Sequence, residues 1–262
     1  MLIVKRIYRK ARSLFKPKQI YKKLKSIFKP NSLLLARTAC LGQDIIALKF
    51  SDIELVNHQK VRADLFLSWI NGAKRPDANV VRPFMLRQDV FPFIEQQANL
   101  PWLSVKKSNK IIIIDSFAEL TDQKFVNKNE GWAFCCHYSD IEHSEAFENE
   151  FECQGLLDIN SLESSYDSFF DYLTKTYPEK TIIFIHFPTT LDNRELYKKR
   201  GVEIKAAVNK LRSKYNNLIS IALADELILP HENDDFPYHF GKETYSHFVT
   251  EINNALSGNY QS

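Results

Sequence analysis

The stretch LLLARTACLGQD, residues 33–44, decides the fold of the body of this chain. Its first four residues are apolar, as in a strand that is covered on both faces, and a helical pattern follows directly. A strand that passes through a tight turn into a helix is the repeating unit of a parallel α/β sheet. The turn lies at the carboxyl end of its strand, which is where open α/β sheets bind their ligands.

Four more apolar runs, at 53–56, 111–114, 181–185 and 218–222, have the length of buried strands. Helical patterns between and after them are marked by Val61, Leu65 and Trp69, by Ile204, Val208, Leu211 and Tyr215, and by Tyr245, Phe248, Ile252 and Leu256. We predict an α/β domain over residues 31–262, with a mainly parallel sheet covered by helices on both faces, as in three-layer flavodoxin-like folds. Residues 127–155 are polar and rich in acids without a clear period, and we expect a long excursion near the site, or a lid.

Residues 1–30 differ sharply in charge from the rest of the chain. They hold eleven of the 35 Lys and Arg residues and none of the 32 Asp and Glu residues. The segment IYRKARSLFKP at 7–17 returns as IYKKLKSIFKP at 20–30, and each copy has the apolar stripe of a short helix that ends at proline. This pattern predicts an amphipathic helical extension that lies in the headgroup region of an anionic membrane; the alternative is a basic tail packed on the acidic body or on a partner protein.

The membrane-binding residues that we predict are nine of the eleven cationic residues of this segment. They are Lys5, Arg6, Arg9, Lys10, Arg12, Lys16, Lys22, Lys23 and Lys25. No apolar core of a secretory signal follows the first residues, and no stretch has the ~20 apolar residues of a membrane-spanning helix. We therefore expect a cytoplasmic protein, peripheral at the inner face of the cell membrane.

Composition excludes several other classes. A nucleic-acid partner is not expected, because the positive charge is confined to one terminal segment. Seven glycines without a phosphate-binding loop argue against a P-loop or dinucleotide fold. The four cysteines lack the spacing of a disulfide framework. No metal site is expected either, because the adjacent Cys135 and Cys136, with His137, His143 and Cys153 nearby, do not fit the usual two-residue gap between ligands.

Two segments carry the side chains that hydrolytic triads use. The turn after the first strand contains Cys40, a nucleophile or simply a small buried residue. The segment NDDFPYHFG, residues 233–241, precedes the last helix, and its Asp235 and His239 can form a general base and the carboxylate that orients it. His186 follows a strand and is either a second candidate base or a hydrogen-bonded core histidine.

The sequence Thr38-Ala39-Cys40, followed by Asp44 and by IIIIDSFAEL at 111–120, resembles the SGNH, or GDS-type, hydrolase superfamily over residues 33–257. More specifically, it resembles an SGNH-like branch found among bacterial polysaccharide-biosynthesis proteins, which carry a Gly-Ser-Cys turn and a strand ending in Asp. The resemblance implies a nucleophile position at Ala39 or Cys40, a base at His239 and its orienter at Asp235. It also implies oxyanion or substrate contacts at Gly42, Asp115 and Ser116.

The departures from the family pattern concern the reacting groups. Ala39 stands where the family has Ser, Thr38 stands where it has Gly, and the spacing from Asp235 to His239 is one residue longer than Asp-x-x-His. Either the chain is a diverged or inactive member, or the residue at 39 was altered. Because a methyl group cannot attack a carbonyl, an active triad must use Cys40, Thr38 or Ser116, or no covalent step at all.

The resemblance implies an acyltransferase, in particular an O-acetyltransferase, or an esterase that modifies a capsule or lipopolysaccharide glycan. Its substrate would be a glycan or lipid-linked saccharide, and its partner a polysaccharide assembly complex. No bound cofactor is expected, and an acyl donor such as acetyl-CoA would be a substrate. The alternatives are a non-catalytic glycan-binding or scaffold protein, for which Ala39 argues, and a glycosyltransferase, in which Asp234-Asp235 would be the metal-binding pair.

Overall fold

The computed structural model describes residues 33–50, 53–105 and 110–257. The chain divides into two units, residues 1–32 and 33–262, and the second is described by itself below. The predicted membrane-binding segment, residues 1–30, lies outside the described residues, so its cationic residues remain a prediction.

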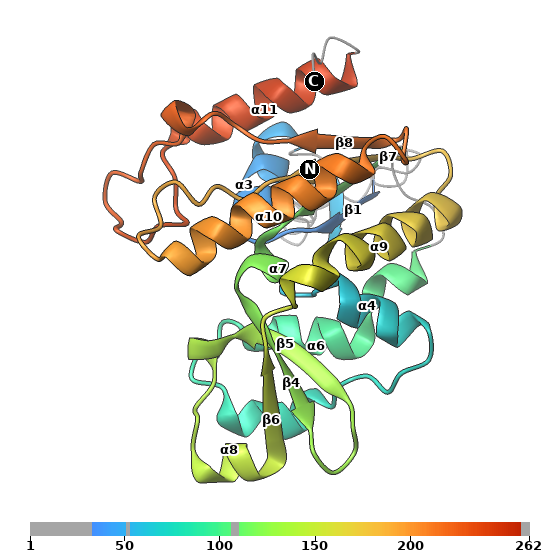
Figure 1. Ribbon diagram of the computed structural model, residues 1–262, viewed down its shortest axis with the longest axis vertical. Coiled ribbons are helices and arrows are strands. Elements are labelled where there is room, and N and C mark those ends of the chain that lie inside the picture. Colours follow the sequence, from blue (N-terminus) through green and yellow to red (C-terminus); the bar gives the residue numbers. More distant parts are fainter. Residues whose placement is uncertain (1–32, 51–52, 106–109, 258–262) are drawn as a thin grey trace, which may run out of the picture. The chain divides into compact units, whose positions relative to one another are not determined.

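The centre of the second unit is a five-stranded parallel sheet, as the sequence predicted (Figure 1). In spatial order its strands are β2 (Glu54–Asn57), β1 (Leu33–Arg37), β3 (Ile111–Asp115), β7 (Thr181–Ile185) and β8 (Leu218–Ile221). All four strand pairs are parallel. The middle strand, β3, is almost entirely isoleucine because both of its faces are buried under helices.

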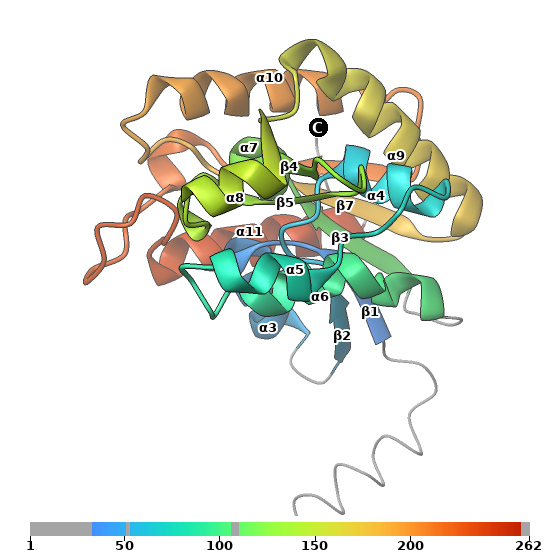
Figure 2. The ribbon, with the colours of Figure 1, turned by 90° about the horizontal axis from the view of Figure 1, so that it is seen from below.

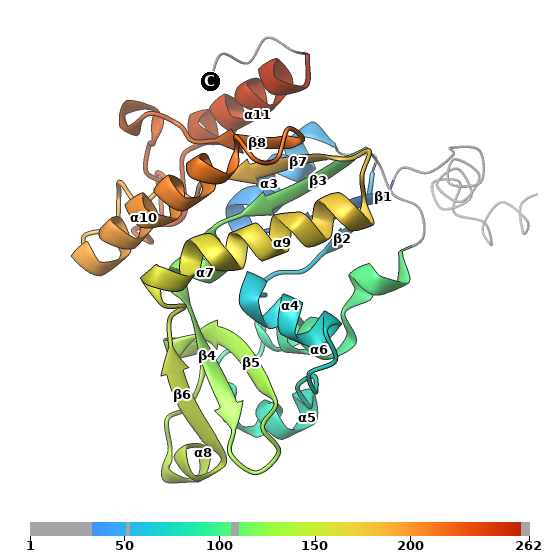
Figure 3. The same ribbon diagram turned by 45° about the vertical axis from the view of Figure 1, so that its right-hand side comes forward.

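Helices cover both faces of this sheet (Figures 1 and 3). On one face α3 (Cys40–Lys49) packs against α11 (Lys242–Leu256). On the other face α9 (Leu162–Thr176) packs against α10 (Glu195–Leu211) and α4 (Ala63–Ile70). The predicted helical stripes point into the core, since Ile204, Val208, Phe248 and Ile252 are buried.

A second, smaller structure occupies the region that was expected to be an excursion or a lid. It is an antiparallel sheet in the order β5 (Ala133–His137), β4 (Asp122–Asn127) and β6 (Phe151–Gly155), with α8 (Glu145–Glu150) before the last strand. Together with α5 (Ala78–Val81) and α6 (Phe91–Asn99) it buries a core of its own, which includes Trp132, Phe134 and Phe151. Figure 2 shows these elements, which we call the small lobe, from below.

The chain enters the parallel sheet at β1, adds β2 on one side and then places β3 on the other. The connections that leave β1 and β3 therefore diverge at the carboxyl ends of these strands, where α3 and the short α7 (Phe117–Thr121) begin. Such a switch point is the usual position of a binding crevice in open α/β sheets. It places the β1–α3 turn beside Asp115, the last residue of β3.

A buried ion pair supports this edge of the sheet. Arg37, at the end of β1, donates to both carboxylate oxygens of Glu119 in α7, at 2.7 and 3.0 Å. Glu119 also accepts hydrogen bonds from the Ala63 amide of α4, at 2.7 Å, and from the Tyr166 hydroxyl of α9, at 3.0 Å. One carboxylate thus joins β1, α4, α7 and α9 beneath the site.

Candidate active site

The turn between β1 and α3 is fixed by the neighbouring strand. The Thr38 amide donates to Asn57 Oδ1 at 2.9 Å, and Asn57 Nδ2 donates back to the Thr38 carbonyl at 3.0 Å. Asn57 is the last residue of β2, so the ends of two adjacent strands are clamped together. Sequence reasoning missed Asn57, because an Asn after an apolar run is an ordinary strand end.

Ala39, the predicted nucleophile position, contacts the carboxyl group of Asp115 through its backbone amide. Its methyl side chain carries no reactive atom. Its amide donates to Asp115 Oδ2 at 2.7 Å, and Asp115 Oδ1 accepts from the Phe117 amide at 3.1 Å. Burial raises the pKa of Asp115 to about 7, although both of these bonds favour its ionised form. The Asp115 carboxyl group therefore joins the two turns at the switch point and occupies the amide of residue 39.

Gly42 and Ser116, both predicted to contact substrate or an oxyanion, have packing partners here. A Cβ atom on Gly42 would lie 2.4 Å from Thr38 Cβ and 3.1 Å from Asp115 Oδ2, so only glycine lets α3 approach the turn this closely. The hydroxyl of Ser116 is buried and accepts a hydrogen bond from the Phe187 amide at 2.9 Å. Their proposed contacts with substrate remain predictions.

Cys40 is the first residue of α3 and lies against the loop that carries the candidate base. Its thiol is 3.9 Å from the carbonyl oxygen of Tyr238. Burial, with a further contribution from the charge of Asp115, raises the pKa of Cys40 to about 12. The group is therefore a thiol rather than a thiolate near neutral pH, which makes it a weak nucleophile.

The predicted His–Asp pair exists with a different carboxylate. His239 Nδ1 is hydrogen-bonded to Asp234 Oδ2, and this bond lowers the pKa of Asp234. The prediction of Asp235 as the orienting residue is wrong, and Asp235 is exposed. The reason is the local turn: Asp234 Oδ1 accepts from the Phe236 amide at 2.8 Å, and the His239 amide donates to the Phe236 carbonyl at 3.0 Å, which brings Asp234 back to the ring.

The loop that carries His239 contacts Asp192 through Tyr238 on one side and α3 on the other. The buried Tyr238 donates its hydroxyl to the carboxylate of Asp192, which also pairs with Arg194 at 2.8 Å. Burial raises the pKa of Asp44, one turn along α3 from Cys40, and the nearby charge of His239 opposes that rise. The loop thus lies along the side of α3 on which Cys40 and Asp44 are neighbours.

An exposed aromatic side chain lies next to the candidate base. Phe236 is 47% exposed, and its ring centroid is 4.9 Å from that of His239. The ring of Phe236 also packs edge-on against Tyr238, at 5.5 Å. A flat apolar surface beside an imidazole is a suitable platform for a ligand ring.

The cysteines and histidines of the small lobe do not form a metal site. Cys135 donates its thiol to the carbonyl of Lys60 at 3.1 Å, whereas the exposed Cys153 donates to Gln123 Oε1 at 3.0 Å. Nowhere in the described part of the chain do three His, Cys, Asp or Glu residues gather as metal ligands. Within the same residues, no helix is both long enough and apolar enough to cross a bilayer.

No protein-family model matches the chain, and no curated protein sequence matches it. Among solved structures, the psychrotrophic esterase EstA from Pseudoalteromonas sp. is similar at 10% identity and a TM-score of 0.37, covering 87% of this chain and 98% of that one. The acetyl xylan esterase Est2A from Butyrivibrio proteoclasticus is similar at 13% identity and a TM-score of 0.40, covering 87% of this chain and 60% of that one.

Proposed function

We propose that this protein transfers an acyl group to a hydroxyl, or cleaves an ester, with His239 as a general base and without a covalent acyl-enzyme. The observation that carries the proposal is the hydrogen bond between His239 Nδ1 and Asp234 beside the start of α3. That bond fixes the ring and leaves Nε2 as the nitrogen that can take a proton. Ala39 has no attacking atom, and the high pKa of Cys40 makes its thiol a poor substitute.

In this mechanism the acceptor hydroxyl, or water, attacks the acyl carbonyl carbon of a donor ester or thioester. His239 Nε2 takes the hydroxyl proton as the new C–O bond forms, and Asp234 stabilises the resulting imidazolium. When the tetrahedral intermediate collapses, the bond to the leaving oxygen or sulfur breaks and the imidazolium returns the proton to that atom. The amino-terminal end of α3, whose N-cap residue Ala39 has no side chain that could cap it, favours negative charge on the intermediate.

A glycan acceptor is the substrate class that we infer. The exposed ring of Phe236 beside His239 offers a stacking surface for a sugar ring. The basic charge of residues 1–30 supports a location at an anionic membrane, where lipid-linked saccharides are assembled. Acetyl-CoA is a donor of suitable chemistry, and capsule or lipopolysaccharide glycan is the proposed acceptor.

A second candidate is a glycan-binding protein without catalysis. It is favoured by Asp115, whose carboxyl group accepts the Ala39 amide at 2.7 Å and so occupies one donor that would otherwise stabilise an oxyanion. The two candidates share the binding surface and differ in turnover.

The test is acyl turnover by the full-length chain with a chromogenic acetyl ester, and with acetyl-CoA plus a glycan acceptor. We expect His239→Gln to lower kcat by about a hundredfold. Cys40→Ser should leave kcat within about twofold, because the thiol takes no covalent part. Loss of turnover in Cys40→Ser, or an acetylated protein seen by mass spectrometry, would contradict the mechanism. Glycan binding by a wild-type chain that shows no turnover would establish the second candidate.

A further inference from the structure

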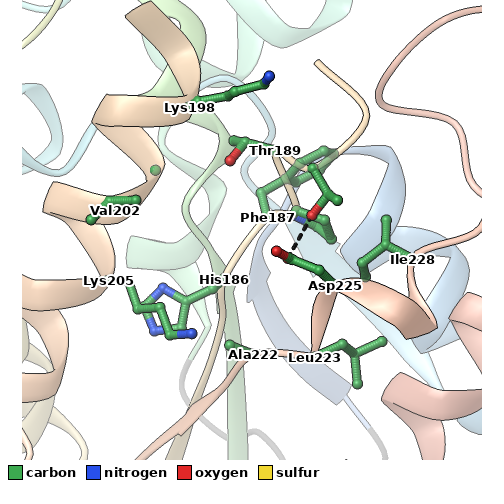
Figure 4. A pocket seen from close by; sticks show the side chains of 13 residues that line it. His186, Phe187, Thr189, Lys198, Val202, Lys205, Ala222, Leu223, Asp225 and Ile228 are labelled. Carbon is green, nitrogen blue, oxygen red and sulfur yellow. Dashed lines mark hydrogen bonds between the residues drawn. The ribbon is translucent and has the colours of Figure 1, made fainter. Parts of the chain in front are cut away.

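A pocket of about 430 Å³ lies at the carboxyl ends of β7 and β8, next to α10 (Figure 4). Phe187 separates it from the candidate active site, because its ring packs on Phe117 at 4.6 Å and on Tyr238 at 5.5 Å between centroids. The pocket has the volume of a small-ligand site. Nothing in the proposed acyl transfer uses it.

His186, the first residue after β7, lines this pocket with its imidazole ring. Ser220 Oγ donates its single hydrogen to Asn209 Oδ1 at 2.9 Å, so at 2.7 Å from His186 Nε2 it can only accept. The proton of the imidazole therefore sits on Nε2, and Nδ1 carries a lone pair. His186 is only 7% exposed, and Nδ1 has no hydrogen-bond partner among the described residues. Leaving such an atom unpaired is costly, which points to a ligand that donates to it.

The other polar groups of the pocket are of two kinds. Asp225 offers a carboxylate, of which Oδ1 accepts from the Thr190 hydroxyl at 2.8 Å. Lys198 and Lys205 come from α10, seven residues and about two turns apart, and both line the pocket. Figure 4 shows Lys205 beside His186, with Lys198 further along the helix near Thr189. The pocket is thus lined by two acceptor side chains and two ammonium groups, of which Lys198 also pairs with Glu195 at 3.3 Å.

We propose that this pocket binds an anionic sugar, that is, a hydroxyl-bearing ring with a carboxylate or phosphate group. Sugar hydroxyls would donate to His186 Nδ1 and to the carboxylate of Asp225, while the anionic group would pair with Lys205 and Lys198. A neutral sugar would leave Lys205 without a counter-charge, whereas Lys198 already pairs with Glu195 at 3.3 Å. A simple anion such as acetate has no hydroxyl to donate, so it would leave His186 Nδ1 unpaired.

The experiment is calorimetric titration of the full-length chain with glucuronate, glucose 6-phosphate, glucose, acetate and inorganic phosphate. We expect at least one of the two anionic sugars to bind about tenfold more tightly than glucose, acetate or phosphate. Tighter binding of glucuronate would identify the ligand as a uronic acid, and tighter binding of glucose 6-phosphate would identify it as a sugar phosphate. Binding should also move the ¹⁵N resonance of His186 Nδ1, because that atom gains a hydrogen bond.

Two lysine variants localise the binding. Lys205→Gln should lower the affinity for the anionic sugar by about tenfold. Lys199→Gln, an exposed position on the same helix that does not line the pocket, should leave its affinity unchanged. Equal affinity for glucose and the anionic sugars, no binding of any of them, or equal effects of the two variants would overturn the proposal. Because binding is measured without turnover, these outcomes are independent of the role of His239.

Discussion

At the scale of single residues, the chemistry of the candidate site depends on which side chains carry a proton and on which groups accept hydrogen bonds from the backbone amides. Asp115 accepts hydrogen bonds from the amides of Ala39 and Phe117 and thereby holds together the two turns beside which a substrate would bind. The Cys40 thiol keeps its proton because it is buried next to that carboxyl group. His239 is the group in this neighbourhood whose geometry suits proton transfer, and a single hydrogen bond to Asp234 sets its orientation.

Glu119 gives the clearest prediction for stability. Replacing it with Gln leaves the Arg37 guanidinium, which is 2% exposed, without its counter-charge. We expect a loss of about 3–5 kcal/mol in the free energy of unfolding, measured by urea denaturation at neutral pH. The control is Glu163→Gln, which removes a surface pair with Lys210 and should cost at most about 1 kcal/mol. Similar losses in the two variants would show that the buried pair is not what stabilises this edge.

At the scale of elements, the long apolar runs predicted the strands of the parallel sheet because buried parallel strands are apolar on both faces. The small lobe was not predicted, since its strands are short and most of its acids, apart from the buried Asp122 and Asp140, lie on the surface around a core of aromatic side chains. The candidate base was found from its position before the last helix. Its partner was not, because Asp234 and Asp235 are adjacent and only the turn at Phe236 selects between them.

Gly42 tests the contact between α3 and the β1–α3 turn. A methyl group there would meet Thr38 Cβ and Cγ2 at 2.4 and 2.5 Å, and the Cβ atom cannot move away without moving the turn. We expect Gly42→Ala to lower the free energy of unfolding by about 1–3 kcal/mol. Gly201→Ala in α10 is the matched control, because its new methyl comes within 3 Å only of the terminal atoms of Thr189, whose Cβ is 3.5 Å away, and alanine favours the helix. A thermal unfolding comparison in which Gly42→Ala is no worse than Gly201→Ala would contradict this packing role.

At the scale of the whole molecule, the strongly basic segment and the α/β body are separate parts of the sequence. The cationic residues of 1–30 precede a body that holds all the acidic residues. In that body the candidate base lies near the carboxyl ends of the strands of a parallel sheet. The sequence predicted this division and the layered architecture from composition and periodicity. It did not predict the pocket beside α10, because His186, Asp225 and the α10 lysines are brought together only by the packing of α10 beside β7 and β8.

Buried histidine makes the stability of the whole molecule depend on pH. Burial lowers the pKa of His186 from 6.5 to about 3, so between these values the unfolded chain binds a proton that the folded chain does not. Stability contributed by this group is therefore lost as the pH falls below 6.5. Between about pH 6.5 and pH 5 the loss should be about 2 kcal/mol. His186→Gln, which keeps a donor for Ser220, should remove this contribution in urea titrations and leave that of His58, whose pKa burial also lowers to about 3. An unchanged slope would show that His186 is protonated in the folded state.

The central claim is that Asp234 orients His239 for proton transfer, and two adjacent substitutions test it most directly. Acyl-ester turnover by Asp234→Asn and Asp235→Asn should be compared in the same full-length protein, with kcat and KM measured separately. We predict that Asp234→Asn lowers kcat by about a hundredfold with little change in KM, because the ring loses its orientation and the imidazolium its partner. Asp235→Asn should leave both constants within about twofold. A loss confined to Asp235→Asn, or an equal loss in both variants, would contradict the account.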